Sequence, residues 1–345
     1  MSKRTDEHDG FPDMAMLARA FQVSKMLQVA AAFELADRVT DGPRSATKLA
    51  QECGANPDML LRLCRALAAF QIFAVDPSGN VSQTRRSAWL RRDAHPTLHH
   101  AARYWTMPSN WAAWGNLEEA IRTGNSAFQI TFDLANFEYL KAHPDEAQLF
   151  DAFMQHSPDD RHAAVAEAYD FSGARLVVDV GGGNGALIAA ILTANPDVHG
   201  LLFDQEMVVS GASQVLSSAR LSERCRVVSG NFFESVPAGG DVYMLSQILH
   251  DWSDDGCQQI LANCRSAMGS EARLLVIERV LDEEPGRTNP MNFLADMQMM
   301  VLFPGAKERT PAEFARLLGD AGFGQPRAIP TRSPFSVVEA RPAGT

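Results

Sequence analysis

A short run of glycines between Asp179 and Gly185 is the first feature of the sequence that indicates ligand binding. The run reads Asp-Val-Gly-Gly-Gly-Asn-Gly, follows an apolar strand-like stretch and precedes an apolar helical pattern that starts near Ala186. Glycines suit such a place because the backbone can turn sharply and approach a ligand where no Cβ intervenes. A turn that serves only the packing of strand on helix is the alternative.

An acidic residue, Asp204, lies nineteen positions after Gly185, at the end of the next predicted strand. A carboxylate there can accept hydrogen bonds from both hydroxyls of a ribose. The third predicted strand ends in Gly230-Asn231-Phe232, where an amide and an aromatic ring could bind and sandwich an adenine, although Phe232 could also be a core residue. The sequence therefore predicts an adenosine-containing cofactor. The loop also satisfies the G-x-G-x-x-G/A pattern of dinucleotide binders, so a nicotinamide dinucleotide stays an alternative.

These residues need a sheet that holds them at one edge, and the last part of the chain predicts one. Short aliphatic or β-branched runs alternate there with helical segments, which is the pattern of a parallel sheet with crossover helices. The chain closes with a pattern typical of a hairpin, at 327–342. Five parallel strands are predicted, at 176–180, 200–203, 225–229, 241–246 and 273–278.

The part of the chain before the sheet is predicted to be helical, with apolar residues at the spacing of a buried stripe. Turn residues at 76–80 separate two short extended runs, so the order of helices and hairpin predicts a winged-helix-like module over 11–104. We expect residues 105–172 to form a helical connector that contributes to the substrate pocket, and residues 173–345 to form the α/β domain. The first helices carry more apolar surface than a lone helical module buries, which predicts a homodimer. The side chains concerned are Met14, Leu17, Phe21, Met26, Val29 and Phe33.

Composition limits the class of protein. The chain has 345 residues, of which 46% are hydrophobic and 21% charged, and these proportions exclude disorder and a fibre. Its formal net charge of -11 argues against a nucleic acid or an anionic membrane surface as partner. No apolar run is long enough for a membrane span, and the first residues carry charges where a signal peptide is apolar, so we expect a cytoplasmic protein. Five scattered cysteines without a C-x-x-C pair predict reduced, mostly buried thiols.

Three histidines lie close together in the sequence, at His95, His99 and His100, and raise the question of a metal site. Pro96 disturbs the helical spacing of the first two, and no carboxylate or cysteine completes a set of ligands. We therefore expect histidines at the surface and no metal.

Further motifs give the chain a specific resemblance. The stretch Ser-Gln-Ile-Leu-His-Asp-Trp-Ser-Asp at 246–254 and the stretch Pro-Gly-Ala-Lys-Glu-Arg-Thr at 304–310 follow the glycine loop, Asp204 and 230–232 in that order. With these motifs the chain resembles the S-adenosylmethionine-dependent small-molecule O-methyltransferases over essentially its whole length. The resemblance implies a C-terminal Rossmann-like domain, an N-terminal winged-helix-like dimerisation domain and a homodimer. It also implies S-adenosyl-L-methionine as cofactor, S-adenosyl-L-homocysteine as product, and no metal.

The same resemblance assigns roles to the cofactor residues. Gly181 and Gly183 would contact the methionine part, Asp204 the ribose, and Asn231 and Phe232 the adenine. The family usually has Asp at the position of Asn231, so the bond to the adenine amine would be weaker or made by the amide oxygen. Ser246 stands where plant members have Lys, which leaves the polar contact of that Lys open. Ser157 stands where plant members have a Ser near the sulfonium side of the pocket. The implied cofactor residues are Ser157, Gly181, Gly183, Asp204, Gly230, Asn231, Phe232 and Ser246.

His250 is the predicted general base. Methyl transfer from a sulfonium has an excellent leaving group, so the enzyme must align the reactants and create a competent oxygen nucleophile. An imidazole with an ordinary pKa of about 6.5 suits removal of a proton from a phenol, whose pKa is about 10. Glu278 and Glu308, which match acids of the family, could orient the imidazole. Asp251 is predicted to cap the following helix, because neighbouring side chains diverge.

The substrate is expected to be a planar aromatic secondary metabolite, phenazine-like or polyketide-like. Thioethers pack adaptably on flat rings, so a methionine-rich cleft suits such a molecule. Plant members have Asn where this chain has Phe303, which favours a more apolar ligand. Methionine and phenylalanine at helical spacing are also ordinary core residues. The candidate substrate residues are Phe150, Met154, Met291, Met300 and Phe303.

Other functions remain as alternatives. Relatives without the histidine methylate nitrogen or hydroxylate an aromatic antibiotic. A helix-turn-helix at 45–70 could belong to a DNA-binding regulator, but its exposed face is poorly basic. An NAD-dependent dehydrogenase could use the same glycine loop, but the chain after the loop is too short for a second nucleotide-binding half and a substrate domain.

Overall fold

The computed structural model describes residues 11–156, 160–209, 211–284 and 289–344. Contacts divide the chain into two compact units, Met1–Trp111 with His143–Pro158, and Ala112–Ala142 with Asp159–Thr345. The stretch 105–172 is therefore shared between the units. The three domain ranges expected from the sequence stay a prediction.

The first unit is a helical module with a small sheet. Helix α5 (Pro57–Ala69) begins after Asn56, whose side-chain oxygen accepts the Asp58 and Met59 N–H groups, and buries the expected apolar stripe. The strands pair in the order β1-β3-β2, and the turn between β2 and β3 is the predicted one. The other elements are α1 (Phe11–Ala18), α2 (Ala20–Ala32), α3 (Leu35–Arg38), β1 (Arg44–Ser45), α4 (Ala46–Cys53), β2 (Phe73–Val75), β3 (Asn80–Gln83), α6 (Arg85–Ala88), α7 (His99–Tyr104) and α12 (Pro144–Gln155), while α8 (Pro108–Trp114) crosses into the second unit.

The first helices of this unit carry several exposed apolar side chains. Met14, Leu17 and Phe21 are 64%, 67% and 55% exposed. Met26 and Phe33 instead pack partly against the core of this unit. The apolar surface that the sequence predicts is thus found at the start of the chain.

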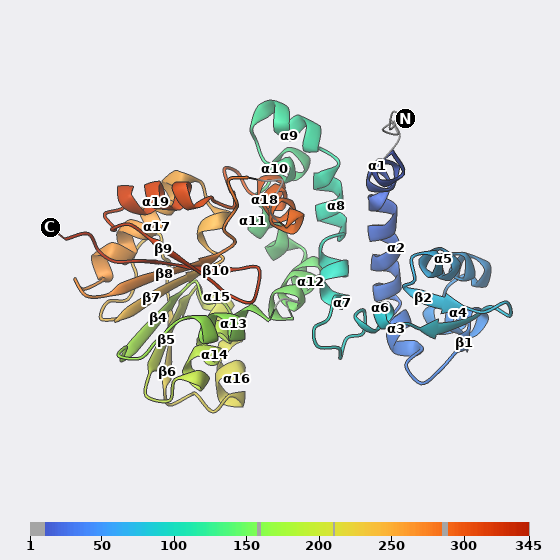
Figure 1. Cartoon of the computed structure of the whole chain (residues 1–345), viewed down its shortest axis with the longest axis horizontal. Helices are drawn as coiled ribbons and strands as arrows, with labels where there is room; N and C mark the ends of the chain where they lie inside the picture. The colour runs from blue at the N-terminus through green and yellow to red at the C-terminus, as the bar shows by residue number, and fades with distance from the viewer. Residues whose placement is uncertain (1–10, 157–159, 210, 285–288, 345) are drawn as a thin grey trace, which may run out of the picture. The chain divides into compact units, whose positions relative to one another are not determined.

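The second unit is an α/β sandwich. Its seven strands pair in the order β6-β5-β4-β7-β8-β10-β9; the first five are parallel, and β10 is antiparallel to both of its neighbours. Figure 1 shows α13, α14 and α16 on one face of this sheet and α17 and α19 on the other, and two apolar cores fill the two faces. In a dinucleotide-binding fold the sixth strand is parallel and follows the fifth at the edge of the sheet. Here the antiparallel β10 lies between β8 and β9, so the strand order disagrees with that of a nicotinamide-dependent dehydrogenase.

The strand predictions hold to within one or two residues. β4 (Leu176–Val180), β6 (Cys225–Ser229) and β8 (Arg273–Glu278) have the predicted bounds, β5 runs His199–Asp204 and β7 runs Val242–Ser246. The closing hairpin is β9 (Arg327–Pro330) with β10 (Ser336–Ala340). The helices are α9 (Leu117–Thr123), α10 (Ala127–Phe132), α11 (Asn136–Ala142), α13 (Arg161–Ala168), α14 (Ala186–Ala194), α15 (Glu206–Val209), α16 (Ala212–Ser218), the 3-10 turn η1 (Leu249–Asp251), α17 (Asp254–Ala267), α18 (Pro290–Leu302) and α19 (Pro311–Asp320).

The expectation of surface histidines is right for His95 and wrong for His99. The His99 side chain is buried, with Nδ1 at 3.3 Å from the Leu90 carbonyl oxygen, and the half-buried His100 ring stacks on His156. The reason is that helix α7 begins at His99 and directs the His99 and His100 rings toward other segments of the same unit. Within the described ranges, no three His, Cys, Asp or Glu side chains are placed to hold a metal ion.

The cysteines agree with the prediction, since all five are free and four are buried. Among the residues that the structure describes, no helix is both long and apolar enough to cross a membrane.

Candidate active site

His250 lies at the carboxyl end of the parallel sheet, where open α/β folds bind their ligands. It follows β7 by four residues and stands in the 3-10 turn η1, with 8% of its surface exposed. Gly305 has a φ of +71°, and a Cβ there would stand 2.9 Å from that of Ser253. The 304–310 segment therefore approaches the histidine loop closely only because it has glycine at this point, and the Lys307 N–H donates to the His250 carbonyl oxygen at 3.1 Å.

The structure brings His250, Glu278 and Glu308 together. Nδ1 of His250 is 3.0 Å from Oε1 of Glu308, so this acid holds the imidazole. Glu278 instead accepts the backbone N–H of His250 at 3.0 Å and so fixes the loop, whereas the sequence predicts that it orients the ring. Both acids are buried, and one oxygen of each has no hydrogen-bond partner.

Asp251 corrects one expectation. It does not cap α17: that position belongs to Ser253, whose hydroxyl accepts the Gly256 N–H at 3.3 Å. Oδ1 of Asp251 lies 3.4 Å from Nε2 of His250. The prediction fails because α17 begins only at Asp254, and because the tight η1 turn lets adjacent side chains converge.

The acids raise the pKa of His250. Burial by itself lowers the pKa of the imidazole, but the charges of Glu308, Asp251 and Glu278 outweigh burial and hold it well above the ordinary 6.5. Burial raises the pKa of Glu278 to about 7 and that of Asp251 to about 6. The sequence suggests an imidazole of ordinary pKa, but the structure gives one whose pKa is closer to that of a phenol, so removal of a phenolic proton costs less free energy.

Changing Glu308 to Gln is expected to move the pH dependence of the proton transfer that the sequence predicts for His250. Only the neutral imidazole accepts a proton, so with His250 as the predicted base kcat/KM rises with pH through its pKa, above neutrality in the wild type. Loss of the Glu308 charge lowers that pKa, so the rising limb moves to lower pH, and the plateau falls because the imidazolium is less stabilised. The check is kcat/KM between about pH 6 and pH 10.

Glu271→Gln is a matched control for this variant, because Glu271 is exposed and precedes the strand that ends in Glu278. Its profile should coincide with that of the wild type. If the rising part of the kcat/KM profile stays at the same pH in Glu308→Gln as well, the group whose ionisation it reports is the acceptor hydroxyl and not His250.

The glycine loop and Asp204 form the second half of the site. The Gly183 N–H donates to Oδ2 of Asp204 at 2.9 Å, and the Gln205 N–H donates to Oδ1 at 2.6 Å. Gly181 has a φ of +72°, and a side chain there would collide with Ile248, two residues before His250. The loop thus needs glycine for its backbone, and it lies directly against the segment that carries the histidine.

The residues expected at the adenine lie beside this loop. A ring carbon of Phe232 would be 3.4 Å from a Cβ on Gly181, and the ring also packs edge-on against Trp252. Asn231 is engaged within its own turn: Oδ1 accepts the Phe233 N–H at 3.0 Å, and Nδ2 donates to Glu234 at 3.0 Å. Gly230 has no room for a side chain, because a Cβ would collide with Phe203.

Two carboxylates lie beside the glycine loop. Asp179, at the start of the loop, is fully buried, neither of its side-chain oxygens has a partner, and burial raises its pKa to about 7. Asp204 is a second acid at the same edge. The Asp204 carboxylate can accept hydrogen bonds from both hydroxyls of a ribose, and acids beside the loop attract a cofactor that carries an amino group and a positively charged sulfonium. The residues present therefore fit S-adenosylmethionine.

The remaining predicted residues are placed as follows. Ser246 is half-buried at the carboxyl end of β7, and Ser157 lies outside the described residues. On α18 and just after it, Met291 is 47% exposed, Met300 is half-buried, and Phe303 is buried with its ring 5.1 Å from that of Phe137.

Phe150 and Met154 lie on α12 in the first unit, where the Phe150 ring is 5.8 Å from that of Tyr104. That they line the same pocket as α18 stays a prediction.

Sequence reasoning missed two side chains that support the site. Asp296 on α18 accepts the Glu308 N–H at 2.9 Å, and Arg309 is completely buried beside the histidine loop. The signal for Arg309 was present in the Lys-Glu-Arg-Thr stretch, where an arginine directly follows a predicted catalytic acid.

Comparison with known proteins identifies the family. An O-methyltransferase domain matches residues 114–324, and an O-methyltransferase dimerisation domain matches residues 15–93. The chain belongs to the S-adenosylmethionine-dependent O-methyltransferases. The chain thus has an N-terminal helical dimerisation domain and a C-terminal Rossmann-like methyltransferase domain.

Relatives of this O-methyltransferase include enzymes of antibiotic biosynthesis. The chain is 37% identical to the phenazine O-methyltransferase of Lysobacter antibioticus, over 95% of each chain. It is 34% identical to the phenazine-1-carboxylate N-methyltransferase of Pseudomonas aeruginosa, over 89% of this chain and 90% of that one. A solved O-methyltransferase from neocarzinostatin biosynthesis, in complex with S-adenosylmethionine and 2-hydroxy-5-methyl naphthoic acid, is 34% identical, with a TM-score of 0.79 over 93% of this chain and 96% of that chain.

Proposed function

We propose that this enzyme methylates a hydroxyl group of a planar aromatic secondary metabolite and that His250 is its general base. The observation that carries the proposal is the contact between Nδ1 of His250 and Oε1 of Glu308, in a loop whose Ile248 lies against the glycine turn. Three acids surround this histidine, and Glu278 and Glu308 among them are buried, which is typical of a functional site.

The chain's own residues divide the work of methyl transfer. When bound, S-adenosylmethionine supplies an electrophilic methyl group on a sulfonium. Gly181, Gly183 and Asp204 would hold it by backbone contacts and by the ribose hydroxyls, with Phe232 against the adenine.

Proton removal falls to His250. Glu308 occupies Nδ1, so Nε2 is the nitrogen that accepts the hydroxyl proton of the acceptor as the new C–O bond forms. Glu308 then stabilises the imidazolium, Asp251 lies beside Nε2, and Glu278 keeps the backbone of the loop in place.

An aromatic acceptor is supported by the chemistry of α18 and by the relatives. Met291, Met300 and Phe303 present thioether and aromatic groups, which pack well on flat rings. The relatives act on a phenazine or bind a naphthoic acid. N-methylation is the second candidate, because one relative of comparable identity is an N-methyltransferase, but that reaction has no hydroxyl proton for His250 to remove.

A panel of acceptors tests the proposal. Hydroxylated phenazines, naphthoates and anthraquinones are incubated with the enzyme and S-adenosylmethionine, each beside a matched compound whose hydroxyl is replaced by hydrogen. We expect one methyl group by mass spectrometry, located on oxygen by NMR, only for hydroxylated compounds. Methylation of a ring nitrogen in both members of a pair would favour the N-methyltransferase instead, and gain of an oxygen atom would overturn the proposal.

We also propose a homodimer that forms through the first helices. The matched dimerisation domain begins at residue 15, and Leu17 is 67% exposed. Leu17→Glu would bury a charge at the interface, which costs several kcal/mol, so we expect monomers. Light scattering during size exclusion measures the mass. Thr47→Glu, an exposed site on α4, should leave the dimer intact, and a wild-type monomer would contradict the proposal.

A further inference from the structure

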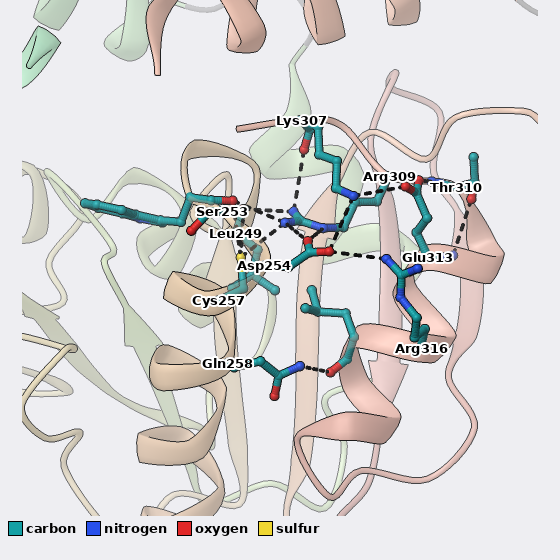
Figure 2. A network of polar contacts seen from close by, with 12 residues as sticks. Leu249, Ser253, Asp254, Cys257, Gln258, Lys307, Arg309, Thr310, Glu313 and Arg316 are labelled. Atoms are coloured by element: carbon teal, nitrogen blue, oxygen red, sulfur yellow. Dashed lines mark hydrogen bonds and ion pairs between the residues drawn. The ribbon is translucent and has the colours of Figure 1, made fainter. Parts of the chain in front are cut away.

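Arg309 is a fully buried cation that bonds to the histidine loop. Its Nη1 donates to the Leu249 carbonyl oxygen at 2.9 Å, and its Nη2 donates to the Trp252 carbonyl oxygen at 3.2 Å and to Oδ1 of Asp254 at 2.9 Å. Figure 2 shows the guanidinium between Leu249, Asp254 and Cys257. The bonded groups flank His250 on both sides in the sequence, so the guanidinium holds the backbone turn that carries the imidazole.

The same residue belongs to the segment that carries Glu308. Arg309 follows Glu308 directly, and its carbonyl oxygen accepts the Leu281 N–H at 2.9 Å, just beyond the strand that ends in Glu278. One residue thus connects the histidine loop, through its side chain, with the segments of both acids, through its backbone.

Charge balance keeps this connection stable. Asp254 pairs with Arg309 through Oδ1, and its Oδ2 meets Lys307 and Arg316 nearer the surface, as Figure 2 shows. Burial by itself raises the pKa of Asp254, but its bonds to Arg309 and Lys307 outweigh burial and lower it, so Asp254 stays ionised. The buried guanidinium is therefore neutralised outside the acid cluster around His250, and it leaves Glu308 to the imidazole.

Only arginine has the geometry for this place. The guanidinium presents a planar fork of five N–H donors, which reaches two carbonyl oxygens and a carboxylate at once. A lysine ammonium keeps the charge but donates from one atom, so it cannot span the same acceptors.

We propose that Arg309 is a positioning residue for methyl transfer: it ties the loop of His250 to the segment of Glu308 and so fixes the contact between Nδ1 and Oε1. The proposal rests on the proposed function of His250 as the base. Displacement of reacting groups by about 1 Å can cost about 10²-fold in rate, so a loose contact would be measurable.

The test compares Arg309→Lys with Arg316→Gln. Arg316 is the matched control because it pairs with the same Asp254 from an exposed position and bonds to no backbone of the histidine loop. For Arg309→Lys we expect kcat to fall about 10- to 100-fold, while the KM of the acceptor and the dissociation constant of S-adenosylhomocysteine stay near wild type. Arg316→Gln should match the wild type in all three.

A second readout does not depend on activity. The protein is labelled with ¹³C-histidine, the His250 signal is assigned by its absence in His250→Ala, and its titration is followed by NMR. In Arg309→Lys the midpoint should fall by about one pH unit, toward that of Glu308→Gln, because the carboxylate no longer lies at contact distance. Adding Glu308→Gln to Arg309→Lys should then have little further effect on the midpoint.

Three outcomes overturn the inference. Either an unchanged His250 midpoint in a folded Arg309→Lys protein, or an equal change in Arg316→Gln, excludes positioning by Arg309. A parallel loss of S-adenosylhomocysteine binding shows a structural role alone. If His250→Ala keeps full activity, the proposed function fails, and the titration still reports separately whether Arg309 sets the contact.

Discussion

Replacement of His250 by alanine is expected to lower kcat for O-methylation about 10²- to 10⁴-fold, the usual contribution of a general base. The loss should depend on the acceptor. A phenol made acidic by a nitro group is already ionised at neutral pH and needs no base, so its methylation should fall much less than that of an ordinary phenol. Initial rates with a series of acceptors of decreasing hydroxyl pKa measure this dependence.

His199→Ala is the matched control for this experiment, since His199 is exposed at the amino end of β5, at the opposite edge of the sheet. It should behave as wild type. Binding of S-adenosylhomocysteine should survive in His250→Ala, which shows that the fold is intact. An equal loss for all acceptors would assign His250 to alignment of the acceptor and not to proton removal.

Replacement of Asp204 by alanine is expected to weaken S-adenosylhomocysteine binding by about 10²-fold or more. A hydrogen bond to a charged group contributes about 1.5–3 kcal/mol, and this carboxylate would lose two such bonds to the ribose. It also holds the Gly183 N–H, so the glycine loop would lose one of its supports. Isothermal titration calorimetry measures the dissociation constant.

Two further variants sharpen the Asp204 experiment. Asp204→Asn keeps one acceptor oxygen and should weaken binding by an intermediate factor. Asp197→Ala removes an exposed acid near the amino end of the same strand and should change nothing. Unaltered binding by Asp204→Ala would place the ribose elsewhere and would remove the basis for the proposed cofactor contacts.

The parallel sheet is predictable from the sequence because its strands are buried on both faces. Continuous aliphatic runs such as that at 274–277 fit a strand that is covered on both faces, and glycine or charged residues mark where the runs end. The helix α14 follows from the glycine turn before it. The position of β10 between β8 and β9 has no local signal, because strand order depends on contacts between distant parts of the chain.

The sequence predicts which residues of the candidate site come together better than it predicts their contacts. His250 follows β7 and Glu278 ends β8, so the topology places both at one edge of the sheet, whereas Glu308 lies between α18 and α19 and was proposed only from its motif. The pKa of His250 could not be read from the sequence, since it depends on how closely buried acids approach the ring. Asp251 was assigned to the wrong partner for the same reason: spacing along the chain does not show how a 3-10 turn directs neighbouring side chains.

The separation of the contacting residues along the chain determines the order in which the two halves of the site can form. Gly183 and Asp204 are 21 residues apart, whereas His250 and Glu308 are 58 apart. Local contacts close early in folding, and during synthesis the N-terminal parts emerge first. The nucleotide-binding corner can therefore assemble while the later segment is still on the ribosome, and the group that activates the acceptor is completed last.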